Sequence, residues 1–118
     1  MSSHLIGTVN VEATIYESIL ATLDSKSRTS VVVDSEGKLV GIVSEGDLLR
    51  AYLKGFQLNT TIIDVMNPNP FFVNKALDKV ELLELWRKTG IETVPVIDEE
   101  RKLLTIQRLR DEENWIIS

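Results

Sequence analysis

The residues best suited to bind a ligand are a serine and a carboxylate at the start of a predicted helix. Ser44 follows the apolar run 39–43, and Asp47 lies three residues further along the chain. Free backbone N–H groups at a helix N-terminus attract anions, and a carboxylate accepts strong hydrogen bonds, so this pair has the chemistry of a ligand site. A serine at the N-cap and an acid at N3 also form a helix cap that needs no ligand. The local sequence alone favours the cap.

A predicted β-hairpin leads into this pair. Its strands are the apolar runs 30–33 and 39–43, and the turn cluster 34–38 between them contains a glycine. Both runs are almost continuously apolar, which predicts strands that are covered on both faces. The predicted helix 47–54 follows the hairpin. The serine and the carboxylate therefore lie where the second strand passes into that helix.

The same pattern recurs after 64 residues, and the alignment needs no gap. Asp34 aligns with Asp98 at the two turns, and Asp47 aligns with Asp111 at the two helix starts. Apolar positions of the strands match as well. Self-similarity of this kind indicates two copies of one structural unit.

Each copy is predicted to fold in the order β-α-β-β-α. The first copy spans about residues 5–54 and the second about 69–118, and the linker at 55–68 contains a predicted short helix at 63–66. The last helix of the second copy falls at 110–117. A unit this small buries too little apolar surface to be stable alone. The predicted fold class is therefore α/β (α+β), with both copies packed about a pseudo-two-fold axis in one domain.

The spacing of apolar residues places the first helix of each copy. It predicts helices at 13–23 and 78–88. Asp78 or Asn74 offers an N-cap to the second of these helices, and Gly90 suits its C-cap.

Composition argues against several classes of function. The chain has 118 residues, a net charge of −5 and no cluster of lysine and arginine, which argues against nucleic-acid binding by phosphate neutralisation. It has no cysteine and a single histidine, His4, so no cysteine- or histidine-based metal site is expected. No apolar run reaches the ~18 residues of a membrane span, and the N-terminus does not resemble a signal peptide. We expect a cytoplasmic protein without a metal or membrane partner.

Three motifs in register resemble those of the CBS domain, in the tandem pair that is also called a Bateman module. Residues 41–47 read GIVSEGD and match the family's Gly-hydrophobic-x-Ser/Thr-x-x-Asp. Residues 64–67 read DVMN and, with Pro70, match its linker. Residues 94–98 read VPVID and match its hydrophobic-Pro-Val-hydrophobic-Asp strand. The resemblance covers almost the whole chain, and 45–55 with 64–67 further resemble CBS pairs fused to bacterial sugar-nucleotide transferases.

The resemblance implies a site for an adenosine-containing ligand in a cleft between the repeats. Asp47 would accept hydrogen bonds from both ribose hydroxyls, Ser44 would donate to a phosphate, and Gly41 would permit close backbone approach. The adenine would meet residues of the second repeat, namely Phe71, Thr93, Val94 and Pro95. The resemblance thus favours the ligand interpretation of Ser44 and Asp47, and their capping role is compatible with it.

A second cleft, related to the first by the repeat, departs from the family's pattern. Asp111 stands at the position of Asp47, but Arg108 replaces the serine and Thr105 replaces the glycine. Two interpretations stay open: Arg108 holds a phosphate, because guanidinium groups bind oxyanions, or the site has lost its function. We expect one occupied site per chain. Its partners from the first repeat would be Thr8, Thr29, Ser30 and Val31.

The function that the resemblance implies is regulatory. The pair would sense AMP, ADP, ATP or S-adenosylmethionine and modulate an attached or associated enzyme, such as a nucleotidyltransferase. The alternative is an interaction domain that dimerises without a ligand. An enzyme is not expected, because no nucleophile or base accompanies the carboxylates of Glu45 and Asp47.

The resemblance also implies an assembly. Family members commonly form flat homodimers through their helices, and the apolar residues Trp115, Ile116 and Ile117 suit such a contact. We further expect this chain to be a piece of a longer protein in which a catalytic domain follows.

Overall fold

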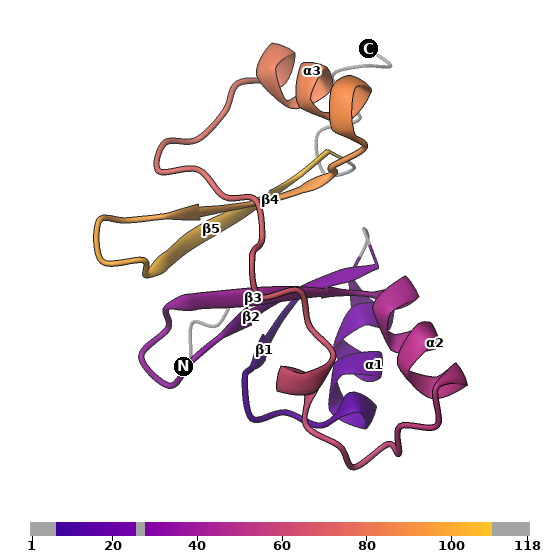
Figure 1. The fold of residues 1–118 in the computed structure, drawn as a ribbon. Coiled ribbons are helices and arrows are strands. Elements are labelled where there is room, and N and C mark those ends of the chain that lie inside the picture. Colours follow the sequence, from indigo (N-terminus) through magenta and orange to yellow (C-terminus); the bar gives the residue numbers. More distant parts are fainter. Residues whose placement is uncertain (1–6, 26–27, 110–118) are drawn as a thin grey trace.

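The computed structural model describes residues 7–25 and 28–109. Its elements in chain order are β1 (Thr8–Asn10), α1 (Ile15–Asp24), β2 (Thr29–Val33), β3 (Leu39–Ser44), α2 (Glu45–Leu53), the 3₁₀ helix η1 (Ile62–Asp64), α3 (Lys79–Thr89), β4 (Thr93–Ile97) and β5 (Leu103–Arg108). Figure 1 shows them as layers, with α1 and α2 below the sheet of β1, β2 and β3, then the hairpin of β4 and β5, then α3. The predicted α+β fold class is confirmed. The helix predicted at 110–117, with its apolar residues 115–117, lies outside the described residues.

Strand pairing follows the 64-residue repeat. In the first repeat β1 pairs with β2 in parallel, and β2 pairs with β3 antiparallel with Thr29 opposite Ser44. In the second repeat β4 and β5 pair antiparallel with Thr93 opposite Arg108, which are the equivalent positions. Both hairpins also shift register at matching positions. The counterpart of β1 is reduced to Val73, which forms a single parallel bridge to β4.

Each α-helix of the described residues begins with a capping box. The N-cap side chain accepts a hydrogen bond from the N–H of N3, and the N3 carboxylate accepts one from the N–H of the N-cap, in the pairs Thr14/Glu17, Ser44/Asp47 and Asp78/Glu81. These bonds satisfy donors that a helix start otherwise leaves unpaired. Asp78 rather than Asn74 therefore caps α3, and Gly90 ends it with φ +80°, in the left-handed region that favours glycine.

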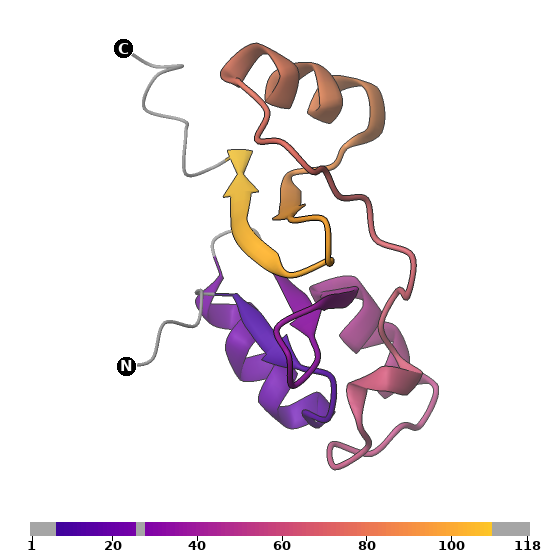
Figure 2. The same ribbon diagram turned by 90° about the vertical axis from the view of Figure 1, so that its left-hand side faces the viewer.

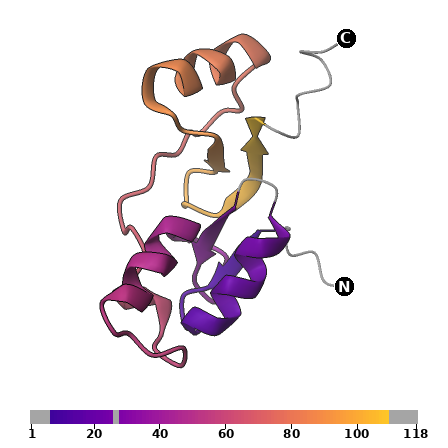
Figure 3. The same ribbon diagram turned by 90° about the vertical axis from the view of Figure 1, so that its right-hand side faces the viewer.

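Two apolar cores lie on opposite faces of the β1-β2-β3 sheet. Figures 2 and 3 show α1 and α2 on the face of this sheet that points away from β4 and β5. The core on the helix side contains the buried residues Val9, Ile15, Val32, Val43, Leu48, Ala51 and Ile62. The core between the two repeats contains Val31, Leu39, Ile97 and Ile106. The neighbours Val31 and Val32 thus serve different cores, which confirms the prediction of strands covered on both faces.

The linker contributes one side chain to the first core. The helix η1 begins at Ile62, one residue before the predicted short helix 63–66. Ile62 is fully buried, whereas Ile63 is 55% exposed. The Ile62 N–H also donates to the carbonyl of Ala13 at 2.9 Å. The linker is therefore fastened to the first repeat before it crosses to the second.

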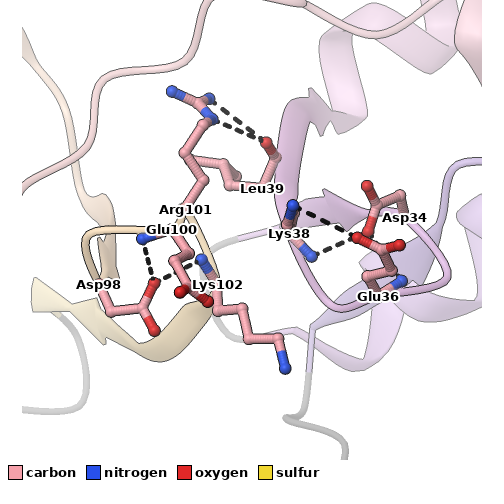
Figure 4. A network of polar contacts seen from close by, with 8 residues as sticks. All are labelled: Asp34, Glu36, Lys38, Leu39, Asp98, Glu100, Arg101 and Lys102. Atoms are coloured by element: carbon pink, nitrogen blue, oxygen red, sulfur yellow. Dashed lines mark hydrogen bonds and ion pairs between the residues drawn. The ribbon is translucent and has the colours of Figure 1, made fainter.

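The two hairpin turns pair with each other across the pseudo-two-fold axis. The Leu39 N–H donates to the Arg101 carbonyl at 2.9 Å, and the Leu103 N–H donates to the Gly37 carbonyl at 3.0 Å. These two bonds are equivalent in the two repeats. The Arg101 guanidinium also donates to the Leu39 carbonyl (Figure 4) and lies 4.9 Å from the centre of the Phe72 ring. The repeats are thus fastened at the turn end of their hairpins.

An aspartate shapes each of these turns. The Asp34 carboxylate accepts hydrogen bonds from the N–H groups of Glu36 at 2.9 Å and Lys38 at 3.0 Å, and Asp98 makes the equivalent bonds (Figure 4). The hydrogen bond from the Lys38 N–H is the main reason that the pKa of Asp34 lies below its ordinary value.

Candidate functional site

A cavity of about 320 Å³ lies between the two repeats, at the end of the hairpins away from their turns. This volume is at the lower end of the range for small-molecule sites, ~300–1,000 Å³. The first repeat, the linker and the second repeat all contribute to its lining, which is formed by Thr29, Ile42, Ser44, Asp47, Asn67, Gly90, Ile91, Glu92 and Thr93. A ligand in this cavity would therefore contact both repeats at once.

Ser44 and Asp47 meet at the start of α2, on the wall that the first repeat contributes. The Ser44 Oγ accepts the N–H of Asp47 at 3.1 Å, and the Asp47 Oδ2 accepts the N–H of Ser44 at 2.9 Å. The cap interpretation of these residues is confirmed. The hydroxyl proton of Ser44 is not used by the cap, so the side chain can still donate to a ligand.

The Asp47 carboxylate keeps acceptor capacity beyond the cap. Its Oδ2 holds the Ser44 N–H, and its Oδ1 accepts a hydrogen bond from Nη2 of Arg50 at 2.9 Å. A carboxylate offers about four acceptor positions, so about one remains on each oxygen. The Asp47 side chain is 24% exposed, which leaves it accessible from the cavity. Two acceptors held side by side match the two neighbouring hydroxyls of a ribose.

The structure brings only part of the predicted site to this cavity. Thr93 lines it together with Ser44 and Asp47. Val94 and Pro95 are buried within β4, and Phe71 is 43% exposed, but none of these three is part of the lining.

Gly41 is also placed away from the cavity lining. It is buried beneath the linker, where a Cβ would come within 2.6 Å of Met66 Sδ and 2.9 Å of the Asn67 carbonyl oxygen. The backbone of Asn67 forms two hydrogen bonds with that of Ile42, at 2.8 and 3.0 Å. The close approach that requires a glycine here is therefore made by the chain's own linker.

Several lining residues were not predicted for this site. Asn67 comes from the linker, and Gly90, Ile91 and Glu92 come from the connection between α3 and β4. Thr29 was predicted for the second cleft but lines this one. The sequence offered one indication for Thr29: it precedes the first strand of the predicted hairpin, and Ser44 follows the second. In the structure the two residues are paired at the same end of these strands.

Arg108 occupies part of the predicted second cleft. It is only 8% exposed. Its guanidinium packs so closely on Gly7 that a Cβ at that glycine would overlap it. An arginine thus fills space at a position where the first repeat carries the much smaller Ser44.

Two other residues predicted for the second cleft, Thr8 and Ser30, lie in the paired strands β1 and β2. Ser30 is fully buried, and its Oγ lies 3.0 Å from the Oγ of Thr22. Thr8 is half-buried in β1. Asp111 lies outside the described residues.

A separate apolar groove of about 260 Å³ runs between α1 and α2. Most of its lining is apolar, including Ile19, Leu48 and Phe56. Large apolar side chains on and around these helices are exposed, among them Tyr16, Leu20, Leu23, Leu49, Tyr52, Leu53 and Leu58. These seven are more than half of the twelve large hydrophobic residues that are exposed in the described part of the chain.

No arrangement for a metal ion is present in the described part of the chain, where three or more His, Cys, Asp or Glu side chains do not gather. Across residues 7–25 and 28–109, no helix is long and apolar enough to cross a membrane.

The sequence matches the family model described as "CBS domain" over residues 1–54 and 62–104. The chain belongs to the CBS domain family. Solved structures with the same fold include pairs of CBS domains, so the two repeats form a tandem CBS pair. Among curated proteins, the inosine-5'-monophosphate dehydrogenase of Methanocaldococcus jannaschii is 31% identical over 105 residues, which cover 88% of this chain and 20% of that protein. The CBS pair spans 17% to 30% of the length of the curated relatives that it matches.

Two solved structures illustrate the likeness of the CBS pair to known folds. A Vibrio cholerae protein named AcuB gives a TM-score of 0.78 at 26% identity, covering 93% of this chain and 82% of that one. The cytosolic domain of the Mg²⁺ channel MgtE, solved in complex with ATP, gives a TM-score of 0.70 at 27% identity, covering 92% of this chain and 44% of that one.

Proposed function

We propose that this CBS pair is a regulatory module that binds an adenosine-containing nucleotide in the cavity between its repeats. The observation that carries the proposal is the joint presence of Ser44 and Asp47 from the first repeat and Thr93 from the second in one cavity. The complex of the MgtE cytosolic domain with ATP supports it, because that chain shares the fold at 27% identity. The ligand class is AMP, ADP, ATP or S-adenosylmethionine.

The chemistry of the cavity fits the two polar parts of a nucleotide. Asp47 accepts hydrogen bonds from the ribose hydroxyls with the acceptor positions that the cap and Arg50 leave open. Ser44 donates its hydroxyl proton to a phosphate oxygen, next to the start of α2, where the helix dipole favours negative charge. Both groups are fixed by the capping box before a ligand arrives, so little order has to be gained on binding.

The position of the cavity couples ligand binding to the angle between the two repeats. The repeats are fastened to each other at their turns, by the Leu39–Arg101 and Leu103–Gly37 hydrogen bonds. The cavity lies at the opposite end of the hairpins, where a ligand touches both repeats. The ligand therefore favours the inter-repeat angle at which the cavity closes on it. The size of this shift is set by the difference between the ligand's affinities for the closed and the open arrangement of the repeats.

The regulated protein is an enzyme or transporter that is attached to the pair or associated with it. The sugar-nucleotide transferase inferred from 45–55 and 64–67 stays a prediction, and the similar proteins named above include a dehydrogenase and an Mg²⁺ channel. A cytoplasmic location belongs to the same proposal, since the MgtE neighbour is a cytosolic domain.

A second candidate function, dimerisation without a ligand, is favoured by the apolar face of α1 and α2. Side chains such as Leu23, Leu49 and Leu53 are 60%, 59% and 82% exposed there. An apolar surface of this kind is typical of an interface. A homodimer through this face is compatible with ligand binding, because the cavity lies on the other side of the first sheet.

The melting temperature of the chain with millimolar AMP, ADP, ATP or S-adenosylmethionine tests the proposed function. A ligand at 100 times its dissociation constant stabilises the native state by ~2.7 kcal/mol, which raises the melting temperature of a domain of this size by several degrees. We expect at least one compound to do so. An unchanged melting temperature with all four, in a protein that sediments as a dimer, would favour the ligand-free interaction domain instead.

A further inference from the structure

We propose that Arg50 is a positioning residue for ribose recognition, which acts through Asp47 and does not itself contact the ligand. This inference rests on the proposed function, since it concerns the carboxylate to which the ribose is assigned. Arg50 holds Oδ1 from one side while the Ser44 N–H holds Oδ2. With one donor on each oxygen, the carboxylate presents one acceptor position on each oxygen to the cavity.

Two of the cavities that border α2 show on which side of the Asp47 carboxylate Arg50 lies. Asp47 lines the candidate ligand cavity and also a neighbouring cavity of about 190 Å³. Arg50 lines only the neighbouring one, together with Lys54 and Asp64. The carboxylate therefore separates the guanidinium from the candidate ligand cavity. A ligand that binds Asp47 from its own side leaves the Asp47–Arg50 pair in place.

Gly46 allows the guanidinium to reach this position. Arg50 folds back along α2, and a Cβ at Gly46 would lie 3.3 Å from its Nη1 atom. Because Gly46 has no Cβ, the guanidinium has room against the start of the helix, where its Nη2 meets Oδ1 of Asp47 at 2.9 Å. A carboxylate that is hydrogen-bonded at both oxygens rotates less freely, which favours the orientation that offers one acceptor position on each oxygen to a 2′,3′-diol.

The Asp47–Arg50 pair has little value as a stabilising ion pair. The Arg50 side chain is 65% exposed, and exposed pairs of this kind contribute little to folding. Substitution of Arg50 should therefore leave the fold intact, so that binding can be measured on a folded variant.

The test compares AMP with 2′,3′-dideoxy-AMP by titration calorimetry on the whole chain. The two ligands carry the same base and phosphate, so the ratio of their dissociation constants reports recognition of the diol alone. We expect the wild type to prefer AMP and Arg50→Met to reduce that preference about three- to tenfold, the value of roughly one hydrogen bond. Arg50→Lys, which keeps a cationic donor, should retain most of it.

Lys54→Met is the matched control, because it removes the same charge from the same neighbouring cavity. It should keep the wild-type preference for AMP, whatever it does to phosphate binding. An Arg50→Met variant that keeps the full preference would overturn the positioning role and leave the proposed function standing. A wild type that binds AMP no better than the dideoxy compound would overturn the ribose assignment and with it the positioning role. A wild type that binds neither compound would overturn the proposed function as well.

Discussion

Asp47→Ala is expected to weaken the binding of adenosine nucleotides about a hundredfold or more. The substitution removes two charge-assisted hydrogen bonds to the ribose, each worth ~1.5–3 kcal/mol, and ~1.4 kcal/mol corresponds to a factor of ten in affinity. The variant should therefore lose the rise in melting temperature that nucleotides give the wild type. Titration calorimetry with AMP measures the change in affinity directly.

This variant needs a control, because Asp47 also belongs to the capping box of α2. Glu17 is the N3 residue of the capping box of α1, and its Oε1 accepts the Thr14 N–H at 2.9 Å. Glu17→Ala thus removes the same local interaction at a helix start outside the cavity. It should lower the melting temperature by a similar amount and keep the response to nucleotide. If the Asp47→Ala variant bound AMP as tightly as the wild type, Asp47 would not be part of the ligand site.

Ile62→Ala is expected to destabilise the fold by ~2–5 kcal/mol, the range for removing a large aliphatic side chain from a core. Ile62 is completely buried, and it joins the linker to the core formed by the first sheet with α1 and α2. A cavity would remain, because the neighbouring backbone is held by the hydrogen bond of Ile62 to Ala13. Unfolding in urea, followed by circular dichroism, measures the loss.

Ile63→Ala makes the same chemical change one residue along the chain. Its side chain is 55% exposed, so the free energy of unfolding should change by no more than ~0.5 kcal/mol. Equal effects of the two substitutions would mean that the linker does not insert Ile62 into the core.

The hairpin turns show why much of the fold was predictable from the sequence. Asp34 and Asp98 bond to N–H groups two and four residues ahead, which is a local interaction with a local sequence pattern. The two aspartates are 64 residues apart, and this spacing indicated that the same hairpin occurs in both repeats. Arg101 was not predictable in the same way. It stands at the left-handed position that Gly37 holds in the first turn, with φ +69° against +81°, and its side chain is held by other segments.

The residues of the candidate site that a helix start positions were predictable from the sequence. Those that are positioned by packing between distant segments were not. Ser44 and Asp47 are positioned by their own capping box, so their spacing in the sequence was sufficient. Whether Val94 and Pro95 face a cavity depends on how one repeat packs on the other, and both are buried. Asn67 enters the lining because Gly41 lets the linker lie close to β3, a contact between segments that no local pattern reveals.

The central claim is that an adenosine nucleotide binds between the repeats with its ribose on Asp47. A crystal structure of the chain with saturating AMP tests it most directly. The account predicts one nucleotide per chain in the cavity between Ser44 and Thr93, with both ribose hydroxyls within hydrogen-bond distance of the Asp47 carboxylate. Nucleotide bound elsewhere, or a cavity filled by the protein's own side chains at saturating AMP, would contradict it.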